Sequence, residues 1–162
     1  MKKLALSFLA VFSLNSFANN MVGINYNDYV NADGYGLSLS GNGDSLVYDV
    51  DVKRLENGPI GVTFNFIHLG YAFGEISDGS FYAGLASVDA NVSGVDRETD
   101  VEVGYVVRDN GGVQWKLGLI AADDSMADFE VQIPAGGGNV ELGALYDGDG
   151  DTWVEIGYSW NF

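Results

Sequence analysis

Apolar residues alternate with polar or small residues in ten short runs that follow residue 20 of the chain. One representative run sets Val101, Val103 and Tyr105 against Glu102 and Gly104. A period of two is that of a β-strand, because its successive side chains point to opposite faces of a sheet. No segment after residue 20 shows a helical period of useful length. The pattern therefore predicts an all-β protein.

The ten runs lie at residues 22–27, 35–40, 46–53, 61–73, 81–85, 101–108, 113–119, 129–133, 140–146 and 155–162. Between the sixth and seventh runs, Asn110-Gly111-Gly112 is a hairpin signal. A register that pairs Val107 with Trp115 and Tyr105 with Leu117 keeps their apolar faces together. An even number of antiparallel strands is typical of an up-and-down transmembrane β-barrel. We favour ten strands, and eight is the alternative if the first and eighth runs are loops.

The fourth run changes phase along its length. Val62, Phe64 and Phe66 have even numbers, whereas Ile67 and Leu69 have odd numbers. If all of these apolar side chains face outward, the two halves of the strand need a β-bulge near Phe66 and Ile67 to bring them into phase. We therefore expect a bulge in this strand.

The connections between the runs form two sets, one for each end of the barrel. The set expected at the outer end covers residues 28–33, 55–59, 89–99, 123–128 and 147–151. It contains most of the loop acids: Asp28, Asp33, Glu56, Asp89, Asp96, Glu98, Asp123, Asp124, Asp128, Asp147, Asp149 and Asp151. The other set, at 41–44, 74–79, 109–112 and 134–138, consists mainly of glycine-rich turns. We expect the acidic outer rim to bind divalent cations weakly.

The N-terminal segment has the pattern of a secretory signal peptide. Lys2 and Lys3 precede an apolar stretch at residues 4–14, and Ser16-Phe17-Ala18 provides a small-x-small cleavage site. We expect cleavage after Ala18, which makes residues 1–18 the signal and residues 19–162 the barrel. The sequence contains no cysteine, so neither a lipoprotein anchor nor a disulfide is expected on this Sec substrate.

The last eight residues alternate as a strand that ends on an aromatic residue. Gly157, Tyr158, Trp160 and Phe162 form a pattern that resembles the assembly signal of bacterial outer-membrane β-barrel proteins. The resemblance implies recognition by the barrel-assembly machinery and residence in the cell outer membrane, in contact with lipid and lipopolysaccharide.

Three further segments extend this resemblance over most of the chain after the signal. Residues 33–37 (DGYGL), 69–73 (LGYAF) and 149–153 (DGDTW) are similar to strand-end signatures of small porin-like outer-membrane proteins of Gram-negative bacteria. The resemblance implies a membrane-embedded antiparallel barrel, but it carries no activity and no functional residue with it.

The charge of the chain excludes some partners. All 23 acids but only five bases follow residue 18, which leaves a net charge of −18 on the expected mature chain. Such acidity argues against binding to nucleic acid. Three Trp, nine Tyr and nine Phe argue against a disordered acidic chain.

If the apolar faces meet lipid, the opposite faces carry charges into the barrel: Asp49, Asp51, Lys53, Glu102, Arg108, Lys116, Glu130, Glu141 and Glu155. They could line a narrow cation-favouring pore. They could also pair with one another and fill the lumen, as side chains do in barrels of about eight strands. We favour the filled lumen. We expect Trp115, Trp153 and Trp160 to join the aromatic girdles at the membrane interfaces.

Two candidate sites give no catalytic or metal-binding prediction. Residues 147–151 (DGDGD) begin like a calcium loop, but the later positions of an EF-hand hold Thr152 and Tyr158 instead of Gly and Glu. His68 is the only histidine, and its sequence neighbours Ile67 and Leu69 offer no catalytic partner. We therefore expect a structural histidine, no enzymatic activity and no cofactor.

The sequence thus predicts a non-enzymatic outer-membrane barrel with a structural or surface-interacting role. One alternative is a narrow channel for small cations or polar solutes. Another is a secreted soluble β-barrel that binds an apolar ligand in its interior.

Overall fold

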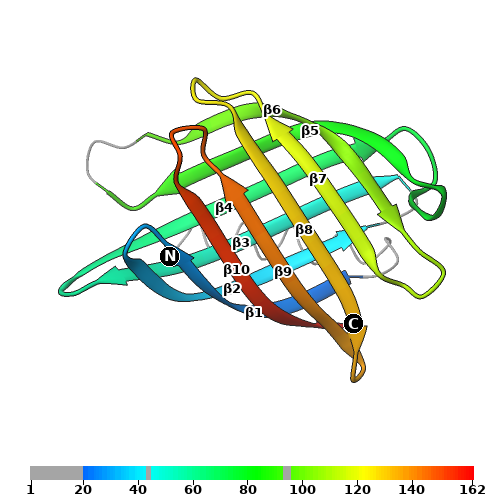
Figure 1. Cartoon of the computed structure of the whole chain (residues 1–162), viewed down its shortest axis with the longest axis horizontal. Coiled ribbons are helices and arrows are strands. Elements are labelled where there is room, and N and C mark those ends of the chain that lie inside the picture. The colour runs from blue at the N-terminus through cyan, green and yellow to red at the C-terminus, as the bar shows by residue number, and fades with distance from the viewer. Residues whose placement is uncertain (1–19, 43–44, 93–95) are drawn as a thin grey trace.

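The protein is a closed barrel of ten antiparallel strands, seen in a computed structural model that describes residues 20–42, 45–92 and 96–162 (Figure 1). The strands are β1 (Asn20–Tyr29), β2 (Ala32–Asn42), β3 (Leu46–Asn57), β4 (Ile60–Ala72), β5 (Ser80–Ala90), β6 (Glu98–Arg108), β7 (Gln114–Ile120), β8 (Met126–Ala135), β9 (Gly138–Tyr146) and β10 (Thr152–Asn161). Each strand pairs with its neighbours in sequence, and β10 pairs with β1 to close the barrel. Ten strands, and not eight, are therefore confirmed. The expected signal peptide lies outside the described residues.

A short 3-10 turn, η1 (Ile76–Asp78), lies in the connection between β4 and β5. Within the described ranges, no helix is long and apolar enough to cross a membrane.

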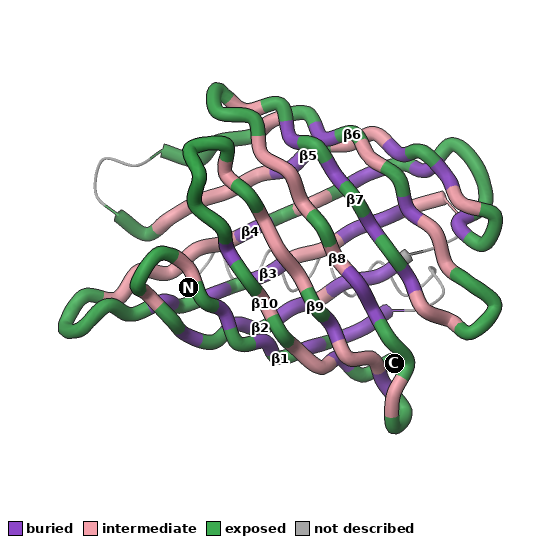
Figure 2. Tube along the Cα trace, viewed as in Figure 1, coloured by how far each residue is buried: buried purple, intermediate pink, exposed green. Residues whose placement is uncertain are grey.

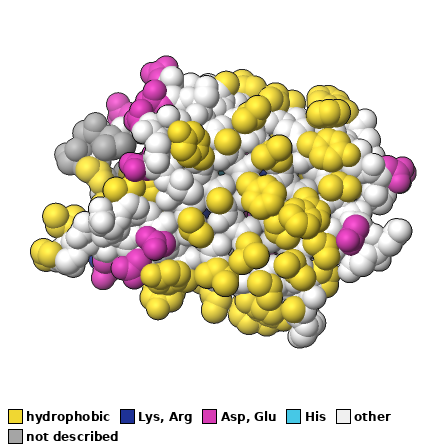
Figure 3. All heavy atoms as spheres, in the orientation of Figure 1, with side chains coloured by type: hydrophobic (Ala, Val, Ile, Leu, Met, Phe, Trp, Pro, Cys, Tyr) yellow, Lys and Arg dark blue, Asp and Glu magenta, His cyan; other side chains and the backbone are white. Residues whose placement is uncertain are grey.

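The two ends of the barrel differ in their connections. Asn20 and Phe162 lie together at one end, where the Phe162 amide donates to the Asn20 carbonyl over 3.0 Å. We call this the terminal end; it also holds the β2–β3, β4–β5, β6–β7 and β8–β9 connections. The opposite, loop end holds the other connections, and acidic side chains gather mainly there, at the left of Figure 3. Several strands extend further toward the loop end than the alternation predicts, since only Val30 and Asn31 separate β1 from β2.

Alternation along each strand gives the barrel an exposed apolar wall and a polar interior. In β1, Val22, Ile24 and Tyr26 are exposed, whereas Asn25 and Asn27 are buried. The tube in Figure 2 changes between exposed and buried along most strands, and apolar side chains cover much of the wall in Figure 3. This is the reverse of a water-soluble barrel, whose interior is normally its apolar core.

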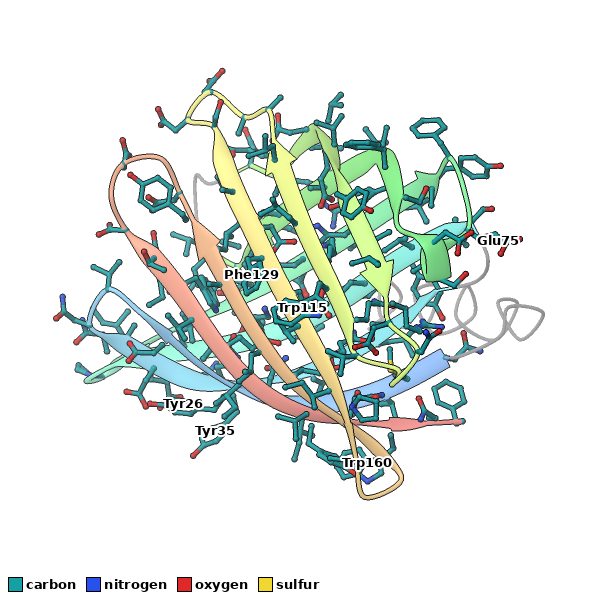
Figure 4. The ribbon with its side chains drawn as sticks, turned by 45° about the vertical axis from the view of Figure 1, so that its right-hand side comes forward. Tyr26, Tyr35, Glu75, Trp115, Phe129 and Trp160 are labelled. Atoms are coloured by element: carbon teal, nitrogen blue, oxygen red, sulfur yellow. The ribbon has the colours of Figure 1, made fainter. Side chains whose placement is uncertain are left out.

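Aromatic side chains stand in pairs on the outer wall, where Figure 4 shows Tyr26 beside Tyr35 and Trp115 near Phe129. The ring centroids are 5.5 Å apart in the first pair and 6.0 Å apart in the second. Such spacings are typical of favourable aromatic pairs.

The pairing of β6 with β7 has the predicted register, with Tyr105 opposite Leu117 and Val107 opposite Trp115. The predicted bulge in β4 is wrong, because β3 and β4 pair without interruption from Leu46 and Tyr71 to Asn57 and Ile60. The change of phase has another cause. Phe64 and Phe66 point into the barrel, while Ile67 and Leu69 on the same strand point out.

Two apolar clusters fill the interior toward its ends. The loop-end cluster consists of Leu55, Phe66 and Trp153, with Tyr29, Ala32, Phe64, Val88 and Leu145 packed around them. The terminal-end cluster consists of Val47, Ala72, Ile76, Tyr82 and Val106. Ile76 belongs to η1, so this turn folds over the end of the barrel. The buried charged side chains lie between the two clusters.

Trp153 does not belong to an outer girdle, and that prediction is wrong. Its ring stacks on Tyr29 at 5.0 Å and meets Phe66 edge-on at 5.2 Å, and its residue is buried. Trp115 and Trp160 are exposed on the wall. Trp153 near the start of β10 thus closes the lumen, whereas Trp160 near its end faces outward.

Candidate functional site

The charged residues expected in the lumen lie on the inner faces of β3, β6, β7, β8, β9 and β10. Asp49, Asp51 and Lys53 belong to β3; Glu102 and Arg108 to β6; Lys116 to β7; Glu130 to β8; Glu141 to β9; and Glu155 to β10. Arg108 lies near the terminal end, where its guanidinium donates to the Gln114 side chain over 2.9 Å. The others surround the middle of the lumen. We call the middle group the charged layer.

One half of the charged layer is centred on the Lys116 ammonium. Its Nζ lies 2.8 Å from Asp128 Oδ2 and 3.5 Å from Glu102 Oε1. The other Glu102 oxygen lies 3.0 Å from His68 Nδ1, and the Tyr82 hydroxyl donates to Glu102 over 2.5 Å. Five strands, β4 to β8, thus supply one interaction network.

The other half is centred on the Lys53 ammonium. Lys53 forms an ion pair with Glu155 and lies 3.6 Å from Asp51 Oδ2. The Asn25 side-chain amide donates to both carboxylates over 3.1 Å. Charge-assisted hydrogen bonds of this kind are stronger than neutral ones. The Lys53 cluster therefore joins β1, β3 and β10 across the seam that closes the barrel.

The Lys53 cluster is also tied to the loop-end aromatic cluster. The Trp153 indole N–H donates to Asn27 over 2.8 Å, and the Asn27 amide donates to Asn25 over 2.8 Å. The Lys53 ammonium lies 4.9 Å from the centre of the Phe66 ring, within cation–π distance. A single set of contacts therefore runs from the charged layer to the apolar layer that covers it.

Three carboxylates of the charged layer form no ion pair with a lysine among the described residues: Asp49, Glu130 and Glu141. Glu130 accepts a hydrogen bond from the Gln132 amide over 2.6 Å. A cavity of about 60 Å³ lies among these three groups, and both lysines also line it. At about 15 Å³ for each, it has room for roughly four water molecules.

Asp128 is a member of the charged layer that the sequence interpretation placed in an outer loop. That placement is wrong, because β8 begins at Met126 and turns Asp128 inward to Lys116. The signal was present, since Asp128 shares its parity with Glu130 and Gln132. A predicted strand that began at Met126, three residues before the run at 129–133, would have included Asp128.

His68 lies inside the barrel, and its partner comes from another strand, not from beside it in sequence. The Glu102 carboxylate comes from β6, two strands away from β4. His68, Glu102 and Asp128 bring ligand atoms within 4.8 Å of one another, a spacing that could hold a metal ion. The Lys116 ammonium already pairs with both acids of that group. We therefore interpret it as an ion-pair network.

At the loop end, the residues 147–151 form a turn around the Asp147 carboxylate. The backbone amides of Asp149 and Asp151 donate to Asp147 Oδ1 over 3.1 and 3.0 Å. The Tyr29 hydroxyl donates to its other oxygen over 3.0 Å. The repeated Asp and Gly residues thus serve the turn, as expected for these residue types.

The C-terminal residues that resemble an assembly signal lie on both faces of β10 and just beyond it. Gly157 faces inward, and Tyr158 donates to the Ala135 carbonyl over 2.6 Å. The Trp160 ring projects from the wall and packs edge-on against Tyr158 with centroids 5.0 Å apart, and Figure 4 shows Trp160 close to the terminal end. Phe162 is exposed.

A search of protein-family models found no match to this chain, and a search of curated proteins found none either. The case for a function therefore rests on the geometry of the barrel.

Proposed function

We propose that the protein is an integral outer-membrane β-barrel of Gram-negative bacteria, with a filled lumen and a non-enzymatic structural or surface-interacting role. The observation that supports this most strongly is the inverted polarity of the barrel. Leucine, isoleucine, valine and aromatic side chains cover the wall, while lysines and carboxylates are buried inside.

The wall fits lipid better than water. A water-soluble monomer seldom exposes one large continuous apolar surface, whereas a transmembrane barrel requires one. Closure between β1 and β10 also satisfies the backbone groups that an open edge would leave without partners in lipid. The same polarity gives little support to a soluble barrel with an apolar ligand, because carboxylates and lysines occupy the middle of the interior.

A filled lumen is supported by the layers inside it. The aromatic cluster around Trp153 lies at one end and the cluster around Tyr82 at the other, with ion pairs between them. The alternative of a narrow cation channel is favoured by the excess of carboxylates around the cavity. We give it second place because a conducting path would have to pass both apolar clusters.

Leucine-to-arginine substitution at residue 117 tests the membrane location. Leu117 is the fourth of seven residues in β7, and its side chain is exposed on the wall. Arginine near the middle of a bilayer costs about 2–4 kcal/mol in a β-barrel. We expect Leu117→Arg to lower the free energy of folding into lipid vesicles by that amount, measured by urea titration.

The matched control is Asp123→Arg, which places the same side chain at an exposed loop-end position. A change below about 0.5 kcal/mol is expected there, as for ordinary surface sites. If Leu117→Arg were as harmless as Asp123→Arg, the wall would face water and the proposed location would be wrong.

Deletion of Phe162 tests recognition by the barrel-assembly machinery. The Phe162 side chain is exposed. Within the described residues, the deletion removes the backbone hydrogen bond from the Phe162 amide to the Asn20 carbonyl. We expect the shortened protein to accumulate unassembled in the periplasm, as measured by cell fractionation and by the loss of a boiling-dependent shift in gel mobility.

Phe73→Ala provides the control, since Phe73 is a similarly exposed aromatic residue near the same end. Its assembly level is expected to match the wild type. Normal membrane levels of the Phe162 deletion would exclude a role for this residue in recognition.

A further inference from the structure

The terminal end of the lumen is closed by side chains from two kinds of element. Four members of the terminal-end cluster, Val47, Ala72, Tyr82 and Val106, belong to strands that are paired on both sides. The fifth member, Ile76, belongs to η1 in the connection between β4 and β5. Ile76 is only 5% exposed, whereas the residues on either side of it are exposed. One residue of a turn therefore completes a cluster that is otherwise built from strands.

The buried part of the turn is the Ile76 side chain. The Asp78 amide donates to the Glu75 carbonyl over 3.2 Å, and the Gly79 amide donates to the Ile76 carbonyl over 3.1 Å, so both of these bonds lie within the turn itself. Glu75 is exposed, and Figure 4 shows it at this end of the barrel. Segments with few buried apolar contacts open locally at a lower free energy than the whole fold. The attachment of the turn to the strands therefore depends on the burial of one isoleucine.

Glycine stands on both sides of the turn, with Gly74 before it and Gly79 after it. Gly79 has a φ of +82°, a conformation that glycine adopts without the steric cost of a Cβ atom. The Phe73 amide, just before Gly74, donates to the Phe81 carbonyl over 2.8 Å. Strand pairing thus continues up to the first glycine. The two glycines mark hinges about which the turn can move while β4 and β5 stay paired.

The internal space of the barrel reaches the terminal-end cluster. A second cavity, of about 10 Å³, is lined by Val47 and Tyr82 of that cluster and also by Lys116 of the charged layer. Ser40 and Asp49 line both this cavity and the one of about 60 Å³. Polar space therefore continues from the charged layer to the inner side of the terminal-end cluster.

We propose that η1 is a lid on the terminal end of the lumen, with Ile76 as its stopper, and that it opens to let water and small solutes reach the charged layer. The ten strands stay paired when Ile76 leaves the cluster. The loop-end cluster also stays in place, so the lid gives access from one end and no path through the barrel. This inference goes beyond the proposed membrane role and does not depend on it, because the lid belongs to the barrel itself.

A single cysteine in the lumen measures this access, because the chain has none of its own. Ser40 lines both cavities and is 7% exposed. The mature chain with Ser40→Cys is refolded in detergent and treated with methyl methanethiosulfonate, a small uncharged thiol reagent. A parallel sample receives a polyethylene glycol maleimide, which is too large to pass a lid of this size. Mass spectrometry of the intact protein follows the labelling, and we expect slow reaction with the small reagent and none with the large one.

Ile76→Ser removes the stopper and leaves every strand residue unchanged. We expect the small reagent to label Ser40→Cys at least about tenfold faster in this background, because burial of an isoleucine side chain favours the closed lid by roughly tenfold to hundredfold. The large reagent should still be excluded. Faster labelling by both reagents would mean that the whole barrel loosens, and an unchanged rate would mean that Ile76 does not control access. Either result would overturn the proposal.

Val47→Ala is the matched control, since it removes apolar atoms from the same cluster but on β3. We expect it to accelerate labelling less than Ile76→Ser does, and an equal acceleration would count against a lid in η1. Trp153→Ala loosens the loop-end cluster instead. If it accelerated labelling as much as Ile76→Ser, entry would not be confined to the terminal end and the proposal would fail. Ser125→Cys, in an exposed loop, should react at the same rate in every background.

Ser38→Cys provides a second reporter in case Ser40→Cys does not refold. Ser38 lines the larger cavity and is 6% exposed. Equal labelling rates with and without Ile76→Ser at both positions would overturn the lid. The membrane location would not be affected by that result, since the Leu117→Arg comparison measures a different face of the barrel.

Discussion

Replacement of Lys116 by methionine is expected to lower the free energy of unfolding by about 3–5 kcal/mol, the usual cost of breaking a buried ion pair from one side. Lys116 is buried, and its ammonium pairs with Asp128 and Glu102 at once. Methionine has a similar length but carries no charge. Both carboxylates would then lie near each other in the lumen without a lysine between them.

Urea unfolding in detergent or lipid measures this loss. The matched control is Arg97→Met, which breaks the exposed pair of Arg97 with Asp89 and should cost about 0–1 kcal/mol. Adding Asp128→Asn to Lys116→Met should restore part of the stability, because it removes one of the two charges left without a partner. Equal effects of Lys116→Met and Arg97→Met would show that the lumen is open to water.

Replacement of Trp153 by alanine is expected to cost about 3–5 kcal/mol, as large-to-small changes of buried aromatic residues do. The indole packs against Tyr29, Phe64 and Phe66, and its N–H holds Asn27. The substitution therefore leaves a hole in the loop-end cluster and also frees a buried amide that positions Asn25.

Trp115→Ala is the comparison, because Trp115 projects from the wall. Its expected cost is about 1 kcal/mol, mainly from the lost contact with Phe129. Equilibrium unfolding of both variants in the same lipid measures the difference. A larger loss for Trp115→Ala than for Trp153→Ala would contradict the assignment of one ring to the lumen and the other to the wall.

Much of the fold could be predicted because the side chains on the two faces of a β-strand alternate along the sequence with a period of two. The ten runs correspond to the ten strands, and the register of Val107 with Trp115 followed from the hairpin between them. Closure between β1 and β10 followed from the even strand number and the need to leave no free edge. These features depend on local alternation and on pairing between neighbours.

The apolar side chains in the lumen could not be predicted in the same way. Phe64, Phe66 and Trp153 are apolar, and an alternating pattern does not distinguish a ring that meets lipid from one that packs inside the barrel. The assumption that every apolar residue faces outward led to the incorrect bulge and to the incorrect girdle position of Trp153. Phe66 and Trp153 meet across the lumen from β4 and β10, which are distant in sequence.

Which residues pair within the charged layer could not be predicted from the sequence, for a related reason. His68 and Glu102 could each be assigned to a strand, but their contact depends on how far each strand is shifted around the barrel. The placement of Asp128 depended on where β8 begins, and strand ends are the least certain part of such a prediction. The charge of a residue and its odd or even position place it on the inner face of its strand, but they do not identify its partner.

The most direct test of the membrane location is fluorescence quenching by lipids that carry bromine on their acyl chains. Two variants are compared in vesicles: Trp153→Phe, which keeps Trp115 and Trp160 on the wall, and Trp115→Phe/Trp160→Phe, which keeps only Trp153 in the lumen. We predict strong quenching in the first variant and weak quenching in the second, because bromine must approach a ring closely to quench it. Weak quenching of Trp115 and Trp160, or equally strong quenching of Trp153, would contradict a barrel whose apolar wall meets lipid and whose lumen is filled.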